Sequence, residues 1–328
     1  MLSQTLFAAA VPSRQILLNV VEQAWKLGYD LYAGAEFHFS VLEKKSGDFC
    51  DLPHDLAEYM RVGLANQGAR VRKAEAPGQY AVVVPLGRVC EIADKLVALK
   101  VLVRSYSSDE YTVTFMPFVG HGSAGNGLKM AWYLFDILEQ KNVCEVRDAL
   151  HEELSLRVQQ SIAGILSVLR DMSILLNPTI NSYKRLKCSI GAGNMAVAWS
   201  RGESPVALNF VTNWAGCGQS ALVLTTADMG VDPFLAYATI SRAALEGIQY
   251  SMEMPQAWSG SAESGDMTLL GKIHQLPTSL AQAIQIAETS DFLRDWLGEA
   301  LDLYLAEKRK EVAEYESTVT DWEIKRYA

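Results

Sequence analysis

The sequence contains few cysteines, and their spacing suits neither a metal site nor a disulfide framework. The five are widely separated and odd in number: Cys50, Cys90, Cys144, Cys188 and Cys217. Structural zinc sites use closely spaced pairs, and small secreted folds use an even, dense set of cysteines. We therefore expect neither a structural zinc ion nor a disulfide-stapled fold.

Positive charge and long apolar runs are also scarce. Lysine and arginine total 29 against 38 acidic residues, which gives a net charge of −9. A surface for nucleic acid or for an anionic membrane needs clustered basic residues. The apolar stretch 161–176 is short and is interrupted by Arg170 and Asp171, and residues 1–10 lack the basic start of a signal peptide. We expect a cytoplasmic protein without nucleic-acid or membrane partners.

The remaining composition is that of a globular enzyme-sized domain. The 328 residues are 49% hydrophobic and 20% charged, which is enough for one large core. Apolar periodicity predicts helices over 12–27, 52–68, 89–104, 146–176 and 233–247. It predicts strands over 32–42, 80–86, 111–118, 195–199, 206–211 and 221–226. With no repeat or linker, this order indicates a single α+β domain over residues 1–328, with an antiparallel sheet.

The C-terminal region has the pattern of a long amphipathic helix. Its apolar stripe comprises Leu301, Leu305, Val312, Tyr315, Val319 and Trp322. Such a stripe covers the protein's own core or binds a partner, and we favour the core.

Several short segments occur in an order that is informative as a set. They are Pro77-Gly78-Gln79-Tyr80, Thr114-Phe115-Met116-Pro117, Gly125-x-Gly127, Asn181-Ser182-Tyr183-Lys184-Arg185-Leu186 and Asp232-Pro233-Phe234-Leu235-Ala236. Together they resemble glutamine synthetase and, more broadly, the γ-glutamyl-amine ligases of that superfamily. The resemblance extends over nearly the whole chain.

This resemblance implies a curved antiparallel sheet, an open barrel flanked by helices, with ATP at one mouth and the amino-acid substrate at the other. Two or three Mg²⁺ or Mn²⁺ ions would lie between them, because phosphoryl transfer to a carboxylate brings several negative charges together. Arg185 would pair with the substrate carboxylate, and Asn181, Gly125 and Gln79 would line the substrate side.

Most positions that the family uses for metal and nucleotide carry other residues here. Of the first Glu-x-Glu pair only Glu36 is kept, and the other metal ligands fall at Gly34, Ala74, Ala81, Lys129 and Val223. Glu75 adjoins Ala74, but a one-residue slip in a strand turns a side chain to the opposite face. The nucleotide and flap positions fall at Ser204, Asn209, Thr225 and Gly191.

The family also begins with a small β-grasp domain that completes the neighbouring subunit's active site, and we expect this chain to lack it. A homo- or hetero-oligomer is therefore expected, for example with a full-length ligase.

The charged residues that remain leave two interpretations open. Glu36, His38, Glu75 and Lys129 are the acid–base candidates, and Glu36 and His38 share a strand face. Lys129 paired with Glu36 would replace a metal ion and its ligand by a neutral pair. Such a network is either a structural remnant or a retained small-molecule site.

Our leading hypothesis is a member that has lost metal- and ATP-dependent ligation and acts as an accessory subunit or small-molecule-binding protein. One alternative is an enzyme with a repurposed cavity for a small carboxylated or amino-acid-derived substrate. Another is a divergent ligase completed by a partner subunit. We predict no metal site from this chain's residues, and the cofactor stays undetermined.

Overall fold

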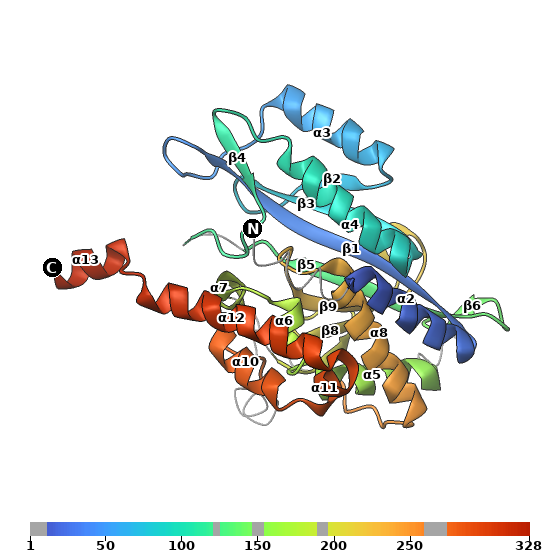
Figure 1. Ribbon diagram of the computed structural model, residues 1–328. Helices are drawn as coiled ribbons and strands as arrows, with labels where there is room; N and C mark the ends of the chain where they lie inside the picture. The colour runs from blue at the N-terminus through green and yellow to red at the C-terminus, as the bar shows by residue number, and fades with distance from the viewer. Residues whose placement is uncertain (1–11, 121–124, 146–153, 189–195, 259–273) are drawn as a thin grey trace.

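The computed structural model describes residues 12–120, 125–145, 154–188, 196–258 and 274–328 (Figure 1). The N-terminal residues 1–10, residues 146–153 of one predicted helix and the flap position Gly191 lie outside these ranges. So does part of the loop between Gly120 and Gly127.

A nine-stranded sheet organises the described chain. Its main path runs β2-β3-β1-β5-β9-β8-β7, with β4 added beside β1 and β6 beside β5. The strands are β1 Tyr29–Glu43, β2 Arg70–Lys73, β3 Gln79–Arg88, β4 Tyr111–Thr114, β5 Leu128–Asp136, β6 Lys141–Asn142, β7 Trp199–Arg201, β8 Leu208–Val211 and β9 Ala221–Ala227. All pairs are antiparallel except β7 with β8. The sheet is open, with β2 and β7 at its ends.

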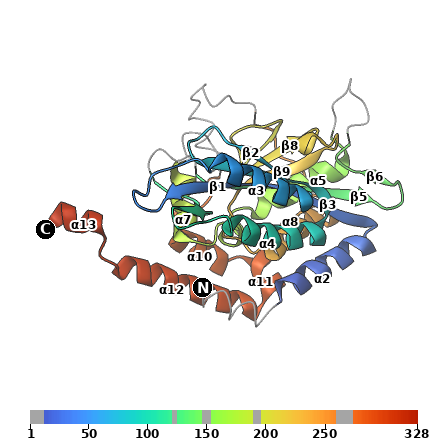
Figure 2. The same ribbon diagram turned by 90° about the horizontal axis from the view of Figure 1, so that it is seen from above.

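The helices gather mainly on one side of this sheet (Figure 2). They are α2 Ser13–Lys26, α3 His54–Asn66, α4 Val89–Arg104, α5 Leu156–Val168, α6 Ser173–Leu176, α7 Ile180–Cys188, α8 Pro233–Gln249, α10 Leu280–Glu288, α11 Asp291–Leu297, α12 Glu299–Ser317 and α13 Asp321–Tyr327. Asp232 caps α8 by accepting hydrogen bonds from the backbone of Phe234 and Leu235.

Strand β1 shows how the sequence separates the core from the site. Successive side chains of a strand point to opposite faces. Phe37 and Phe39 are fully buried in the main hydrophobic core, whereas Glu36 and His38 face the other side. A register irregularity between Ala33 and Ala35 marks a local bulge in the pairing with β3.

The fold corrects one predicted helix and adds a strand that the sequence did not predict. The predicted helix 146–176 is broken: α5 starts at Leu156 with Ser155 as its cap, and a turn at residues 169–172 separates it from the short α6. Both pieces bury the same apolar stripe, so periodicity could not reveal the break. Strand β5, which pairs with β1 over nine residues, was not predicted at all.

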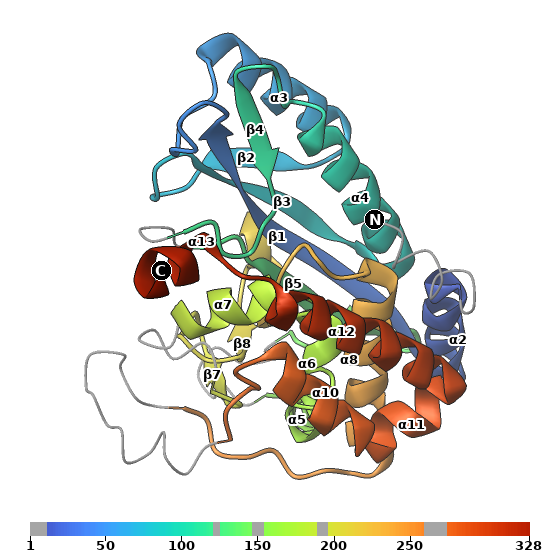
Figure 3. The ribbon, with the colours of Figure 1, turned by 60° about the vertical axis from the view of Figure 1, so that its left-hand side comes forward.

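The C-terminal stripe divides into a packed and an exposed part. Leu301 and Leu305 are buried, as predicted. Val319 and Trp322, by contrast, are 69% and 64% exposed, so the expectation that they pack on the core is wrong. We call residues 318–328, which carry α13, the C-terminal arm; it lies away from the body in Figures 1 and 2. In Figure 3 it is the dark red segment that follows α12 and ends at the C-terminus.

None of the helices in the described part of the chain combines the length and apolar character needed to cross a bilayer.

Candidate functional site

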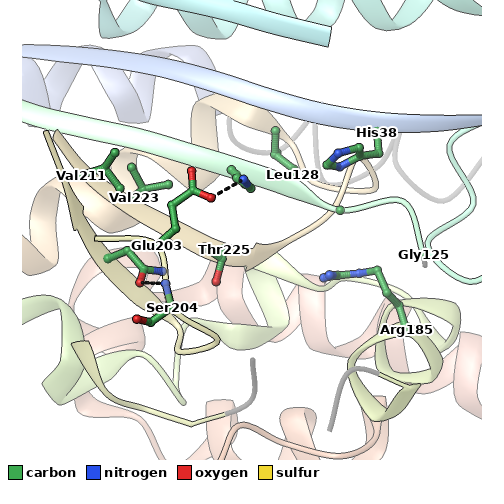
Figure 4. A pocket seen from close by; sticks show the side chains of 12 residues that line it. His38, Gly125, Leu128, Arg185, Glu203, Ser204, Val211, Val223 and Thr225 are labelled. Atoms are coloured by element: carbon green, nitrogen blue, oxygen red, sulfur yellow. Dashed lines mark hydrogen bonds and ion pairs between the residues drawn. The ribbon is translucent and has the colours of Figure 1, made fainter. Parts of the chain in front are cut away.

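The charged face of the sheet borders a cavity of about 220 Å³ (Figure 4). Strands β1, β5, β8 and β9 contribute to it, together with α7 and the turn after β7. The side chains of His38 and Arg185 point into the same space from different elements. The lining residues are His38, Gly125, Gly127, Leu128, Lys129, Arg185, Glu203, Ser204, Asn209, Val211, Val223 and Thr225.

Glu36 is the centre of a charge cluster at this cavity. It lies directly opposite Lys129 in the β1–β5 register, and its Oε1 is 3.4 Å from Lys129 Nζ. His38 Nε2 lies 3.8 Å from the same oxygen, and Arg72 Nη2 donates to Oε2 at 3.2 Å. The pair suggested by the sequence is therefore present, with a second cation added by Arg72.

Cations around Glu36 determine its protonation. Burial alone would raise the pKa of Glu36, but Lys129, His38 and Arg72 together outweigh it and hold that pKa below its ordinary value. For His38, burial lowers the pKa, and the attraction of Glu36 only partly opposes it. The cluster at neutral pH is thus a carboxylate between cations, with a neutral imidazole beside it.

Oε1 of Glu36 is buried and receives no hydrogen bond from within the described residues. Lys129 Nζ makes only an ion-pair contact with it at 3.4 Å, and the neutral His38 ring lies 3.8 Å away. Buried carboxylate oxygens ordinarily accept hydrogen bonds, so this oxygen can accept one from a ligand's N–H or O–H group.

The space beside Gly34 is filled by a tryptophan. A Cβ atom at Gly34 would lie 2.9 Å from Trp214 Nε1 and 3.2 Å from the Val84 carbonyl oxygen. Trp214 packs with Ala131 and Val223 in a small apolar cluster on this side of the sheet. A glutamate could not occupy position 34 without displacing the Trp214 side chain.

Arg185 is held by the protein itself. It is 5% exposed, and its Nη2 donates to Asn177 Oδ1 at 3.2 Å, to Ala227 O at 3.1 Å and to Thr226 O. Burial lowers the pKa of Arg185 and raises that of the neighbouring Asp228, while each charge opposes the shift of the other. These bonds fix the guanidinium at the cavity wall, and its role toward a substrate stays a prediction.

Gln79 and Gly125 have structural partners as well. Gln79 Nε2 donates to Gly125 O at 2.8 Å and to Asn126 Oδ1 at 3.1 Å. Gly125 has φ of +77°, and a Cβ there would lie 2.8 Å from Arg185 Cγ. Glycine is therefore required at this turn for its backbone geometry and for its close contact with Arg185.

Asn181 clamps the segment that follows β4. Its Oδ1 accepts from Phe118 N at 2.7 Å, and its Nδ2 donates to Phe118 O at 3.0 Å. Both ends of the amide are thus engaged by one backbone residue. Asn181 positions the chain near the cavity but is not among the residues that line it.

The structure separates Glu75 from the other candidates. Glu75 is exposed in the connection between β2 and β3 and does not line the cavity. From this part of the chain it is Arg72 of β2, and not Glu75, whose side chain reaches the cluster. Arg72 pairs with Ala81 of β3, and Ala81 pairs with His38 of β1. We find no support in this geometry for Glu75 as a replacement ligand.

Sequence reasoning missed Arg72 and Glu203. Glu203 Oε2 lies 3.7 Å from Lys129 Nζ from the turn after β7. Period-two spacing along residues 70–73 could have placed Arg72 on the inner face, whereas a turn residue such as Glu203 gives no periodic signal.

The positions expected to meet nucleotide are occupied by short polar side chains with internal partners. Asn209 Oδ1 accepts from Ser200 Oγ at 2.6 Å and from Ser204 N at 3.0 Å. Thr225 Oγ1 donates to Val206 O at 2.9 Å. These contacts stabilise the β7–β8 turn and supply no cation for a phosphate.

The donor set does not fit a divalent metal ion. In the described ranges, no cluster of three or more histidine, cysteine, aspartate or glutamate side chains is placed to hold one. Glu36 is surrounded by Lys129, Arg72 and His38, and an ammonium group has no lone pair to offer a cation. We therefore derive no step through a metal.

Comparisons with known proteins agree with this architecture. The sequence model of the family described as glutamine synthetase, catalytic domain, matches residues 10–327. Glutamine synthetase of Methanosarcina mazei is 28% identical over 342 residues, covering 96% of this chain and 74% of that protein. The Halobacterium salinarum enzyme of the same name is 29% identical over 337 residues, covering 96% and 73%.

Solved structures show the same fold. A structure described as GmaS without ligand superposes with a TM-score of 0.81 at 22% identity, covering 96% of this chain and 76% of that one. A GmaS complex with ADP gives a TM-score of 0.80 at the same identity and coverage.

Proposed function

Because this chain belongs to the glutamine synthetase catalytic-domain family, we propose that its sheet cavity is a descendant of the family's site that binds a small carboxylated or amino-acid-derived molecule without a metal ion or ATP. The observation that carries this proposal is the Glu36–Lys129 pair at 3.4 Å. A permanent internal cation there supplies the positive charge that a divalent ion would otherwise supply.

The cavity's chemistry supports an amino-acid-like ligand. Lys129 and Arg185 line the cavity and would present cationic groups to a carboxylate. Glu36 does not line the cavity, but its buried Oε1, beside Lys129, has no hydrogen-bond donor among the described residues. Val211 and Val223 form the apolar wall against which a short hydrocarbon chain packs. A volume of about 220 Å³ suits a molecule of amino-acid size and is small for a nucleotide.

Calorimetric titration tests the proposal directly. The purified chain is titrated with ATP in Mg²⁺ or Mn²⁺, and separately with glutamate, glutamine and short dicarboxylates without metal. We expect no cation-dependent ATP heat, and saturable binding of at least one carboxylate. Lys129→Gln should abolish that binding, whereas Lys44→Gln, on an exposed turn, should leave it unchanged.

Two outcomes would overturn this view. Micromolar, cation-dependent ATP binding would instead support the divergent ligase completed by a partner subunit. Chemical conversion of a bound carboxylate, detected by mass spectrometry, would favour the repurposed enzyme, with Glu36 and His38 as its acid–base pair.

We also propose that the chain assembles, with itself or with a partner such as a full-length ligase. The exposed apolar side chains Val319, Trp322 and Tyr327 on the C-terminal arm support a protein contact. Light scattering after size exclusion should show an oligomer that Trp322→Ser weakens. Trp25→Ser, at a 57% exposed tryptophan on α2, is the matched control. A monomer at all concentrations, with no partner retained on co-expression with a full-length ligase, would contradict the proposal.

A further inference from the structure

A second cavity, of about 190 Å³, lies between α4 and the connection from β9 to α8. Its walls are mainly apolar, formed by Leu96, Val101, Leu128, Met229, Val231 and Pro233. Leu128 of β5 lines both this cavity and the first one. The mouth opens to solvent beside Val97 and Val101, which are 44% and 67% exposed.

Lys100 brings an amine into this apolar space. It is one of two charged residues among those that line the cavity, and its Nζ donates a hydrogen bond to the backbone carbonyl of Met229. That bond holds the Lys100 amine against the Met229 side of the cavity. A lysine with its nitrogen held in an apolar pocket is the arrangement in which amines act as nucleophiles.

The surroundings favour the neutral amine. Burial lowers the pKa of Lys100, and the positive charge of Arg104 lowers it further. Asp228 and Asp232 are the acidic groups that oppose this shift. Only the neutral form has the lone pair that attacks a carbonyl carbon.

Arg104 is the other charged residue of the cavity wall, one helical turn after Lys100. Its guanidinium carbon lies 5.7 Å from the centroid of the Phe115 ring. Arginine binds carboxylates with two parallel hydrogen bonds. A reactive carbonyl beside a carboxylate group would therefore meet an amine and a guanidinium at the same time.

We propose that Lys100 is the nucleophile of a second small-molecule site, where it condenses with the carbonyl of a short 2-oxo acid whose carboxylate Arg104 binds. The amine nitrogen forms a bond to the carbonyl carbon, and a proton moves from nitrogen to oxygen. The resulting carbinolamine loses water to give an imine. The step is reversible, and nothing is oxidised or reduced.

The cavity limits what can react. Its size and apolar wall favour an acid with a short alkyl chain and exclude larger or heavily hydroxylated carbonyl compounds. The site is independent of the sheet cavity that carries the proposed function, because none of its reacting groups belongs to the Glu36 cluster.

Reductive trapping tests the proposal on the whole wild-type protein. Pyruvate or 2-oxobutyrate is added with cyanoborohydride at neutral pH, and peptides are mapped by mass spectrometry. We expect Lys100 to be alkylated roughly tenfold faster than Lys95, an exposed lysine on the same helix. Its rate should also reach its maximum at lower pH than that of Lys95.

Two variants separate the parts of the site. Lys100→Arg keeps a nitrogen donor that can bond to Met229 but has no neutral amine, and it should lose the adduct. Arg104→Gln should slow trapping of the oxo acids while leaving trapping of propanal, which lacks a carboxylate, unchanged. Equal labelling of Lys100 and Lys95 by the oxo acids in the wild-type protein would overturn the proposal.

Discussion

Lys129 faces Glu36 across neighbouring strands, with its ammonium nitrogen 3.4 Å from the carboxylate. The contact between these two charged side chains is therefore set by the register of β1 and β5. Arg72 approaches the same carboxylate from β2. The pairing of β2, β3, β1 and β5 thus holds the Glu36 carboxylate between two cations.

Replacing Lys129 by methionine should destabilise the protein and change the charge of Glu36. Removing one partner of a buried pair leaves the other charge uncompensated, typically at a cost of roughly 3 kcal/mol. Because Arg72 still compensates the Glu36 carboxylate in this variant, we expect a smaller loss of stability than this value. Urea unfolding at pH 7 measures the loss, which should shrink as the pH is lowered and Glu36 takes up a proton. The double variant Glu36→Gln, Lys129→Met should recover stability, and a failure to do so would contradict a compensating pair.

Gly34 and Trp214 should prove energetically coupled. Ala at position 34 places a Cβ 2.9 Å from Trp214 Nε1, and we expect a destabilisation of about 2 kcal/mol from overpacking. Trp214→Phe removes Nε1, the atom that the new Cβ would contact. The double variant should therefore lose less unfolding free energy than the two single variants lose in sum. Circular dichroism in urea follows all four proteins without relying on tryptophan fluorescence. Strict additivity would show that Trp214 does not fill this space.

The fold was largely predictable, and the site only partly. Helix α4 follows from its periodicity to the residue, and strand β3 follows from its own to within two residues. The resemblance predicts Arg185 and Gln79 as substrate contacts, a prediction that stays open. Their bonds to backbone carbonyls depend on loops whose geometry no local pattern encodes. Arg72 reaches Glu36 because of strand register, and Trp214 reaches Gly34 through a turn. Both are contacts between distant segments, which periodicity does not report.

Acidification should destabilise the protein through His38 as well as Glu36. Both have a folded pKa below the ordinary value, so the unfolded chain binds protons first as the pH falls. Stability is then complete above the ordinary pKa of histidine, about 6.5, and declines below it. Unfolding free energies measured from pH 8 to pH 4 should show this decline. His38→Asn should flatten its upper part, whereas His54→Asn, at a fully exposed histidine, should not.

Gly164 and Gly247 allow α5 and α8 to pack with their backbones in contact. A Cβ at Gly164 would lie 2.2 Å from Ala243 O, and one at Gly247 would lie 2.1 Å from Gln160 O. Alanine is the better helix former by about 1 kcal/mol, yet backbone atoms cannot move aside as side chains can. We therefore expect Gly164→Ala to destabilise the protein by about 3 kcal/mol.

Gly63→Ala on α3 is the matched control for this prediction. Its new Cβ would meet only the hydroxyl end of the Tyr106 side chain, at 2.4 Å, and that end can rotate away. The propensity gain should offset most of the contact, so the variant should stay within about 1 kcal/mol of the parent. Thermal and urea unfolding of both variants give the comparison. Equal effects at the two glycines would mean that α5 and α8 can separate without loss, and that the tight crossing is not what holds these helices together.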